Sequence, residues 1–176
     1  MNTISQDKTA IIFGRRSIRV YSPGKVTEAQ ITRMLEAAMA APSAMSKDPW
    51  RFIVIEEPKT LEILPQHLPG GSMLKTAAAA IVVCGDLDAA FERNISYLLQ
   101  DCSAAIENLL ICAHGLSLGA CWVGVHPDEK SIQSLKQLFS LPNSVVPIAV
   151  IALGVPGEDP GSRTRYKASL VHREKW

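Results

Sequence analysis

The chain has 176 residues, which is the length of one ordinary domain with room for a buried core. Its 18 basic and 17 acidic residues leave a net charge of +1, so no overall field favours a nucleic acid or an anionic membrane as partner. No apolar run approaches the roughly 18 residues of a membrane span. Residues 1–7 lack the charged and apolar regions of a signal peptide, so we expect a single cytoplasmic domain over residues 1–176.

Apolar residues make up 47% of the chain, a share that fits either a large core or extra surface buried in an obligate oligomer. The cysteines lie in apolar stretches without a C-x-x-C pair, at Cys84, Cys102, Cys112 and Cys121. Cysteines in such surroundings usually behave as small buried hydrophobic residues, and their spacing argues against zinc. We therefore expect no metal site.

The N-terminal elements are a helix and a short extended piece. The helix is expected over residues 6–15, with Ile11 and Ile12 on its buried side. The extended piece covers residues 18–21, and the turn Ser22-Pro23-Gly24 follows it.

A second helix starts at a capping box. In this motif Thr27 and Gln30 satisfy each other's free backbone groups. Pro42 ends the helix, because the residue before a proline avoids the α conformation. The apolar positions recur with helical spacing at Ile31, Met34, Leu35 and Ala38.

Residue patterns predict the remaining elements, and together they indicate an α+β fold. The helix over 96–118 is apolar around well over half its circumference, which indicates burial on several sides and suits the middle of a dimer. Residues after about 156 show no strong periodicity. The predicted strands are 51–56, 79–84, 120–125 and 145–153, and the other predicted helices are 58–66 and Pro127–Phe139, with Pro127 in the first turn.

The segment Arg15-Arg16-Ser17-Ile18-Arg19 has the composition of an anion-binding site. Guanidinium groups bind phosphate oxygens through two parallel hydrogen bonds, and a hydroxyl adds another donor. The simpler interpretation is a solvated helix end, where the helix dipole favours cations. That interpretation accounts for Arg15 and Arg16 but leaves Ser17 and Arg19 unexplained.

The segment Ala41-Pro42-Ser43-Ala44, which runs on to Pro49-Trp50, is made of small residues after a helix. Such a segment lets a backbone approach a flat ligand closely. A plain helix stop would need only Pro42.

Both segments resemble signatures of the FMN-dependent nitroreductase family, R-R-S-x-R and A-P-S-A-x-N-x-Q-P-W. The sequences over 100–110 and 118–124, and Arg163-Thr164-Arg165, resemble further motifs of that family in the same order. The resemblance spans residues 11–173. It implies a nitroreductase-like fold, with a central mixed sheet flanked by helices, and an interlocked homodimer with FMN at the subunit interface.

The resemblance also implies roles for individual residues. Arg15, Arg16 and Ser17 would bind the FMN phosphate or ribityl chain, and Arg19 would lie near flavin N1 and O2. Residues 42–44 of the partner subunit would lie against one face of the ring. The remaining implied cofactor contacts are Ser46, Trp122, Val123, Gly124, Arg163 and Arg165, although Trp122 also fits a core position.

Two further features bear on this set of contacts. The backbone N–H near Val123-Gly124 would point to flavin N5, and a glycine permits that close approach. Ser46 and Asp48 stand where the family usually has Asn and Gln. The resemblance therefore does not define how this chain contacts its substrate.

The implied activity is an FMN-dependent oxidoreductase that uses NADH or NADPH to reduce nitroaromatic, quinone or related small-molecule acceptors in two half-reactions. No constellation of histidines or carboxylates indicates a protein acid or base, which fits hydride chemistry at the flavin. Two alternatives stay open: a non-catalytic FMN carrier or redox sensor, and an oxidoreductase dedicated to one metabolite.

Overall fold

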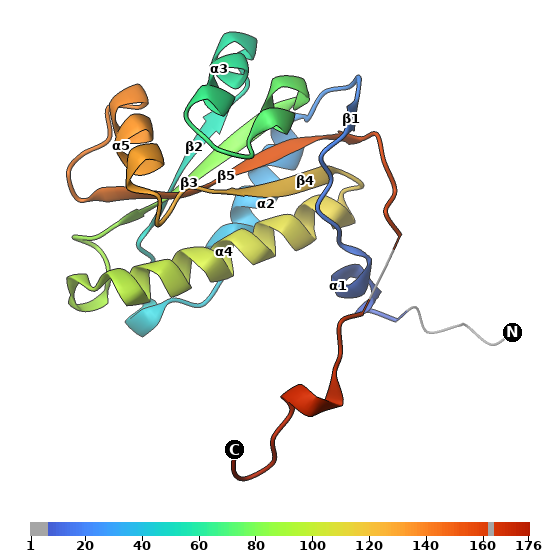
Figure 1. Cartoon of the computed structure of the whole chain (residues 1–176), viewed down its shortest axis with the longest axis vertical. Coiled ribbons are helices and arrows are strands. Elements are labelled where there is room, and N and C mark those ends of the chain that lie inside the picture. The colour runs from blue at the N-terminus through green and yellow to red at the C-terminus, as the bar shows by residue number, and fades with distance from the viewer. Residues whose placement is uncertain (1–6, 162–163) are drawn as a thin grey trace, which may run out of the picture.

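A computed structural model describes residues 7–161 and 164–176 of the chain. Among these residues a five-stranded sheet lies between two layers of helices (Figure 1). The helices are α1 (Ala10–Gly14), α2 (Glu28–Met39), α3 (Pro58–Ile63), α4 (Ile95–Gly115) and α5 (Glu129–Leu138). The strands are β1 (Tyr21–Ser22), β2 (Trp50–Ile55), β3 (Ala79–Asp86), β4 (Gly119–Gly124) and β5 (Val145–Pro156).

The sheet runs in the order β4-β5-β3-β2, and β1 adds to the end of β5. The strand pairs are antiparallel, and one isolated parallel bridge joins Ser17 to Ala120. The sheet is therefore mixed, as predicted. Strands β4 and β2 form its opposite edges.

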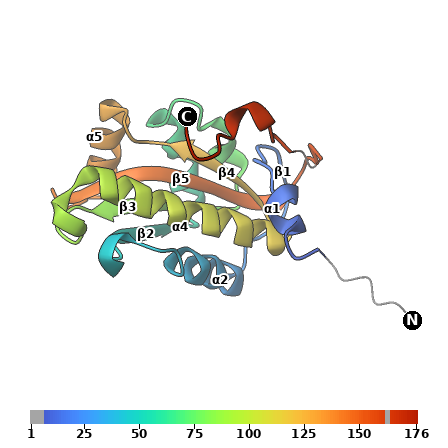
Figure 2. The same ribbon diagram turned by 90° about the horizontal axis from the view of Figure 1, so that it is seen from below.

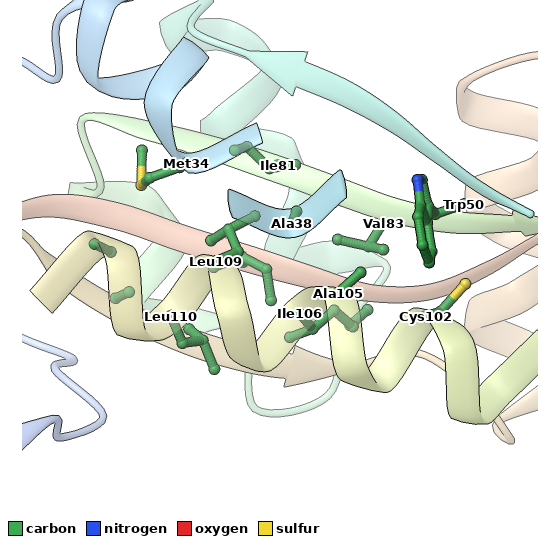
Figure 3. Close-up of a cluster of buried hydrophobic side chains, with 14 of the residues drawn as sticks. Met34, Ala38, Trp50, Ile81, Val83, Cys102, Ala105, Ile106, Leu109 and Leu110 are labelled. Atoms are coloured by element: carbon green, nitrogen blue, oxygen red, sulfur yellow. The ribbon is translucent and has the colours of Figure 1, made fainter. Parts of the chain in front are cut away.

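The two faces of the sheet bury separate apolar clusters. α2 and α4 cover one face, and α3 and α5 cover the other, which Figure 2 shows from below. Figure 3 shows the first cluster, to which α4 contributes Ile106 and Leu109, β3 contributes Ile81 and α2 contributes Met34. The helical periodicity of the α2 and α4 sequences thus reflects real burial.

Local signals explain where several elements begin. Thr27 and Gln30 form the predicted capping box of α2. The helix α5 begins after Asp128, whose carboxylate accepts from the Ser131 N–H, so Pro127 lies outside the helix rather than in its first turn. The Asp128 side chain provides the start signal that the prediction had assigned to the proline.

The prediction for the first helix was wrong in extent and in burial. α1 has five residues, and neither Ile11 nor Ile12 is buried. Only its inner side meets the body, where a Cβ on Gly115 would come within 2.8 Å of Ile11 Cδ1. The helix packs against the outside of α4, and none of the described elements forms a second layer above it.

Three of the four cysteines have the predicted buried environment. Cys84, Cys102 and Cys121 are buried, Cys112 is half-buried, and all four are free thiols. Burial raises the pKa of the Cys84 and Cys102 thiols to about 12, so both are neutral and inert near neutral pH.

Candidate functional site

The arginine segment is fixed where it passes the start of β4. Ile18 donates its N–H to the Ala120 carbonyl at 3.0 Å, and Ser17 forms the parallel bridge to the same residue. The Ile18 side chain is buried over Gly119, where a Cβ would come within 2.8 Å of Ile18 Cγ2. Because Ile18 is anchored, the preceding arginines are held next to the sheet edge.

A cavity of about 260 Å³ gathers basic residues from both ends of the chain. It is lined by Ile12, Phe13, Arg15, Arg16, Thr164 and Arg165. The predicted ligands Arg15, Arg16 and Arg165 therefore share one site. Arg163, the fourth predicted arginine, lies outside the described residues.

Arg16 has a buried donor without a partner. Its Nε is inaccessible to solvent and forms no hydrogen bond with any described residue. Leaving a buried donor unpaired costs about 1–3 kcal/mol, more for a charged group. An anion in the neighbouring cavity would satisfy this cationic side chain.

Arg15 has a partner that the sequence did not indicate. Its Nε lies 3.1 Å from Oε1 of Glu107 on α4. The two groups are not aligned as a hydrogen bond, so the contact is an ion pair between half-exposed side chains. Glu107 belongs to the α4 sequence in which the motif was found, but only the fold brings it to Arg15.

Arg19 is exposed, and its backbone is fixed by a second carboxylate. Glu158 Oε1 accepts the N–H groups of Arg19 and Val20, at 2.5 and 3.1 Å. Burial raises the pKa of the Cys121 thiol, and the positive charge of Arg19 reduces this increase. The Arg19 guanidinium therefore acts on Cys121 of β4, the residue before Trp122.

The outer edge of β4 offers free backbone donors. Ala120 faces Ile18 on the outer side, whereas Val125 donates to Ile148 of β5 on the inner side. Because hydrogen-bonding groups alternate between the two sides along a strand, the N–H groups of Trp122 and Gly124 point outward. In the described part of the chain only β5 is a strand partner of β4.

The side chains on this edge leave room for a ligand. Trp122 is 36% exposed and so is not a core residue. A Cβ on Gly124 would meet nothing within 4 Å, and a cavity of about 420 Å³ adjoins Gly124 and His126. A flat molecule can therefore approach the Gly124 backbone.

Residues 42–48, which follow α2 and contain the predicted small-residue segment, form a tightly hydrogen-bonded loop that we call the shelf. The Ala44 N–H donates to Asp101 Oδ1 of α4 at 2.9 Å, and Asp101 is only 5% exposed. The Ser43 hydroxyl donates to Asp48, whose own N–H donates back to Ser43 Oγ at 3.0 Å. Asp48 thus closes the loop, and Met45 and Ser46 within it have positive φ of 51° and 52°.

The shelf and the free β4 edge lie on opposite sides of the molecule. The loop leads directly into β2, and β3 and β5 separate β2 from β4. Three strand spacings amount to about 14 Å. Pro42, Ser43 and Ala44 of one chain therefore do not face Gly124 of the same chain.

Comparison with known proteins decides the family. The model of the Nitroreductase family matches residues 12–69 and 64–155. A protein of Methanothermobacter thermautotrophicus, provisionally named NADH dehydrogenase/NAD(P)H nitroreductase, is 44% identical over 162 residues, which are 92% of this chain and 84% of that protein. The chain belongs to the nitroreductase family.

Solved structures of similar proteins support the same assignment for this family member. A protein of Clostridium acetobutylicum, provisionally named NADH oxidase, is 38% identical with a TM-score of 0.90, covering 94% of this chain and 99% of that one. A provisionally named nitroreductase of Desulfovibrio desulfuricans, in complex with FMN, is 32% identical with a TM-score of 0.84, covering 98% and 99%. The predicted fold is confirmed, and so is the class, since this is a family of oxidoreductases.

Two observations complete the description of this nitroreductase. None of the described helices combines the length and apolar character that crossing a membrane would need. Within residues 7–161 and 164–176, no group of three or more His, Cys, Asp or Glu side chains could hold a metal ion.

Proposed function

We propose that this chain binds FMN and uses NADH or NADPH to reduce nitroaromatic, quinone or related small-molecule acceptors. The observation that carries the proposal is the cavity in which Arg15, Arg16 and Arg165 meet, with the Arg16 Nε buried and unpaired. Three cations around one cavity suit a phosphate. The structure of the Desulfovibrio desulfuricans relative contains FMN, which supports FMN as the source of this phosphate.

The edge of β4 extends from the arginine cavity to a free backbone donor. About 13 Å of strand separates Ala120 from Gly124, a span that a ribityl chain and a ring system cover together. The phosphate would lie at Arg15, Arg16, Ser17 and Arg165, and the ring would reach the Gly124 N–H. Trp122 would border the ring, whereas Val123, whose side chain is buried in the second apolar cluster, could contribute only backbone atoms.

When bound, FMN supplies the hydride chemistry that links NAD(P)H to a second substrate. The protein would bind the flavin and polarise its ring. The outward N–H of Gly124 would donate a hydrogen bond to the ring edge at N5. Arg19 would place a positive charge near N1 and O2, where reduction adds negative charge. No side-chain acid or base is required, so each substrate can use the same open face in turn.

We further propose that the site is completed by a second copy of the chain. Residues 42–44 and Ser46 lie a sheet width away from β4 of their own chain, so they can cover a ring at Gly124 only from a partner subunit. The exposed apolar side chains of α1 and of residues 164–176 supply additional surface for such a homodimer.

Absorbance and stopped-flow measurements test the activity. Flavin released from the purified protein by heat should elute as FMN, and recovery of FAD would contradict the proposal. Rapid mixing with NADH or NADPH should bleach the bound flavin, and a nitroarene or quinone should restore its colour. A flavin that neither nucleotide reduces at a useful rate would indicate the non-catalytic carrier instead.

A further inference from the structure

Glu107 is an acidic residue beside a site that we propose to bind an anion. Its Oε1 lies 3.1 Å from the Nε of Arg15, and the side chains of Arg15 and Glu107 are 26% and 46% exposed. A carboxylate near a phosphate is unfavourable by charge alone. Glu107 can favour phosphate binding only if another contribution outweighs this repulsion.

The contact is closest at the Nε edge of the Arg15 guanidinium. No described residue accepts a hydrogen bond from its Nη1 or Nη2. The guanidinium is planar and presents its donors in a fixed fork. With Nε held by Glu107, the two terminal nitrogens remain available to a ligand, and Arg15 also lines the cavity.

The same helix positions the backbone before Arg15. Glu107 and His114 lie two turns apart on one side of α4. A Cβ on Gly14 would come within 2.7 Å of His114 Nε2, so α1 packs tightly at this point. α4 thus fixes both the start of the arginine segment and the orientation of its first guanidinium.

We infer that Glu107 is a positioning residue that orients Arg15 toward the phosphate of the flavin. The inference rests on the proposed FMN site. An arginine held in its binding orientation loses less conformational freedom when the phosphate arrives. Removing the carboxylate should therefore weaken FMN binding, whereas charge repulsion alone predicts that removal would strengthen it.

Binding titrations of Glu107→Gln with two flavins test this inference. Glutamine keeps the size of the side chain and removes its charge, and the exposed site should tolerate the change. We expect the FMN affinity to fall about three- to tenfold. The affinity for riboflavin, which has no phosphate, should stay unchanged. Equal or tighter FMN binding, or an equal loss for both flavins, would overturn the inference.

Two further variants separate this role from the site itself. Glu36→Gln removes a carboxylate paired with Arg33 at 2.9 Å on the surface of α2, and it should change neither affinity. In an Arg15→Ala background, Glu107→Gln should no longer weaken FMN binding, because only the repulsion between carboxylate and phosphate is left to remove. If Arg15→Ala weakens FMN but Glu107→Gln does not, only the inference fails. If Arg15→Ala has no effect, the proposed phosphate site fails with it.

Discussion

The sheet with α2 and α4 differs sharply from the terminal segments in how its apolar side chains are covered. Ile106 and Leu109 of α4 are fully buried by their own chain (Figure 3). In contrast, Ile12 is 55% exposed and Leu170 is 72% exposed. Residues 164–176 extend away from the body in Figure 1.

The difference shows which parts of the molecule one chain completes. The core has what a stable fold needs, since burial of apolar surface is the main driving force for folding. The candidate site is instead built from the less covered parts, namely the arginine segment, the tail and an edge strand. Large exposed apolar side chains grouped in this way mark an interaction surface. We therefore expect folding to depend on the core and cofactor binding to depend on assembly.

The largest expected effect is the loss of FMN binding when the subunits separate. Leu170→Asp places a charge among the exposed apolar side chains of the tail and should weaken the dimer. FMN binding should then disappear over the same concentration range in which analytical ultracentrifugation shows monomers. Ser169→Asp adds the same charge one residue earlier and should have a smaller effect. A stable monomer that still holds FMN would contradict the dimer proposal.

A substitution that creates a cavity in the core should lower the stability of the fold, in contrast to the tail substitution, which should weaken the dimer. Leu109→Ala should lower the free energy of unfolding by about 2–5 kcal/mol, because the fully buried side chain leaves a cavity. Urea denaturation followed by circular dichroism measures the loss. Ile12→Ala serves as the comparison and should cost much less in dilute protein. Similar losses in both variants would mean that α1 is as well covered as α4.

The cations of the cavity should affect FMN affinity without affecting folding. Arg15→Ala and Arg165→Ala should each weaken FMN binding by about 1.5–3 kcal/mol, the usual contribution of a hydrogen bond to a charged group. Isothermal titration with FMN gives the value. Arg33→Ala, on the exposed surface of α2, is the matched control and should bind FMN normally. Unchanged affinity in both cavity variants would place the phosphate elsewhere.

Much of the fold follows from local sequence patterns. The capping box at Thr27 and the long apolar helix α4 were predicted because their signals lie within a few residues of each other. The burial of Ile11 and Ile12 was predicted wrongly, because periodicity identifies an apolar face but not what covers it. In the case of α1, no layer formed by residues 7–161 or 164–176 covers this face.

The sequence predicted the residues proposed to contact the cofactor, but not the residues that hold them in place. The arginines and Gly124 stand in recognisable motifs, whereas Glu107, Glu158 and Asp101 act through contacts that only folding creates. Glu158 reaches the Arg19 N–H across 139 positions of sequence. Asp48 showed no partner in the sequence, and the structure pairs it with Ser43 inside the shelf loop.

The smallest expected effect concerns Arg19, whose role at the pyrimidine end is a prediction from sequence. If its guanidinium lies near N1 and O2, it stabilises the negative charge of the reduced flavin more than it stabilises the oxidised form. Losing about 1–2 kcal/mol of this selective stabilisation should lower the midpoint potential by roughly 20–45 mV, at about 30 mV per 1.4 kcal/mol for a two-electron couple.

Redox titration of flavin-saturated variants measures this shift. Arg19→Lys should keep much of the effect, because the charge matters more than the fork geometry, whereas Arg19→Gln should show the full decrease. The Glu158 contacts go to backbone N–H groups of Arg19 and Val20, so either substitution leaves this anchor in place. Equal potentials in the wild type and Arg19→Gln would place the side chain away from the ring. In that case Arg19 would be a solvated cation whose backbone, not its charge, serves the site.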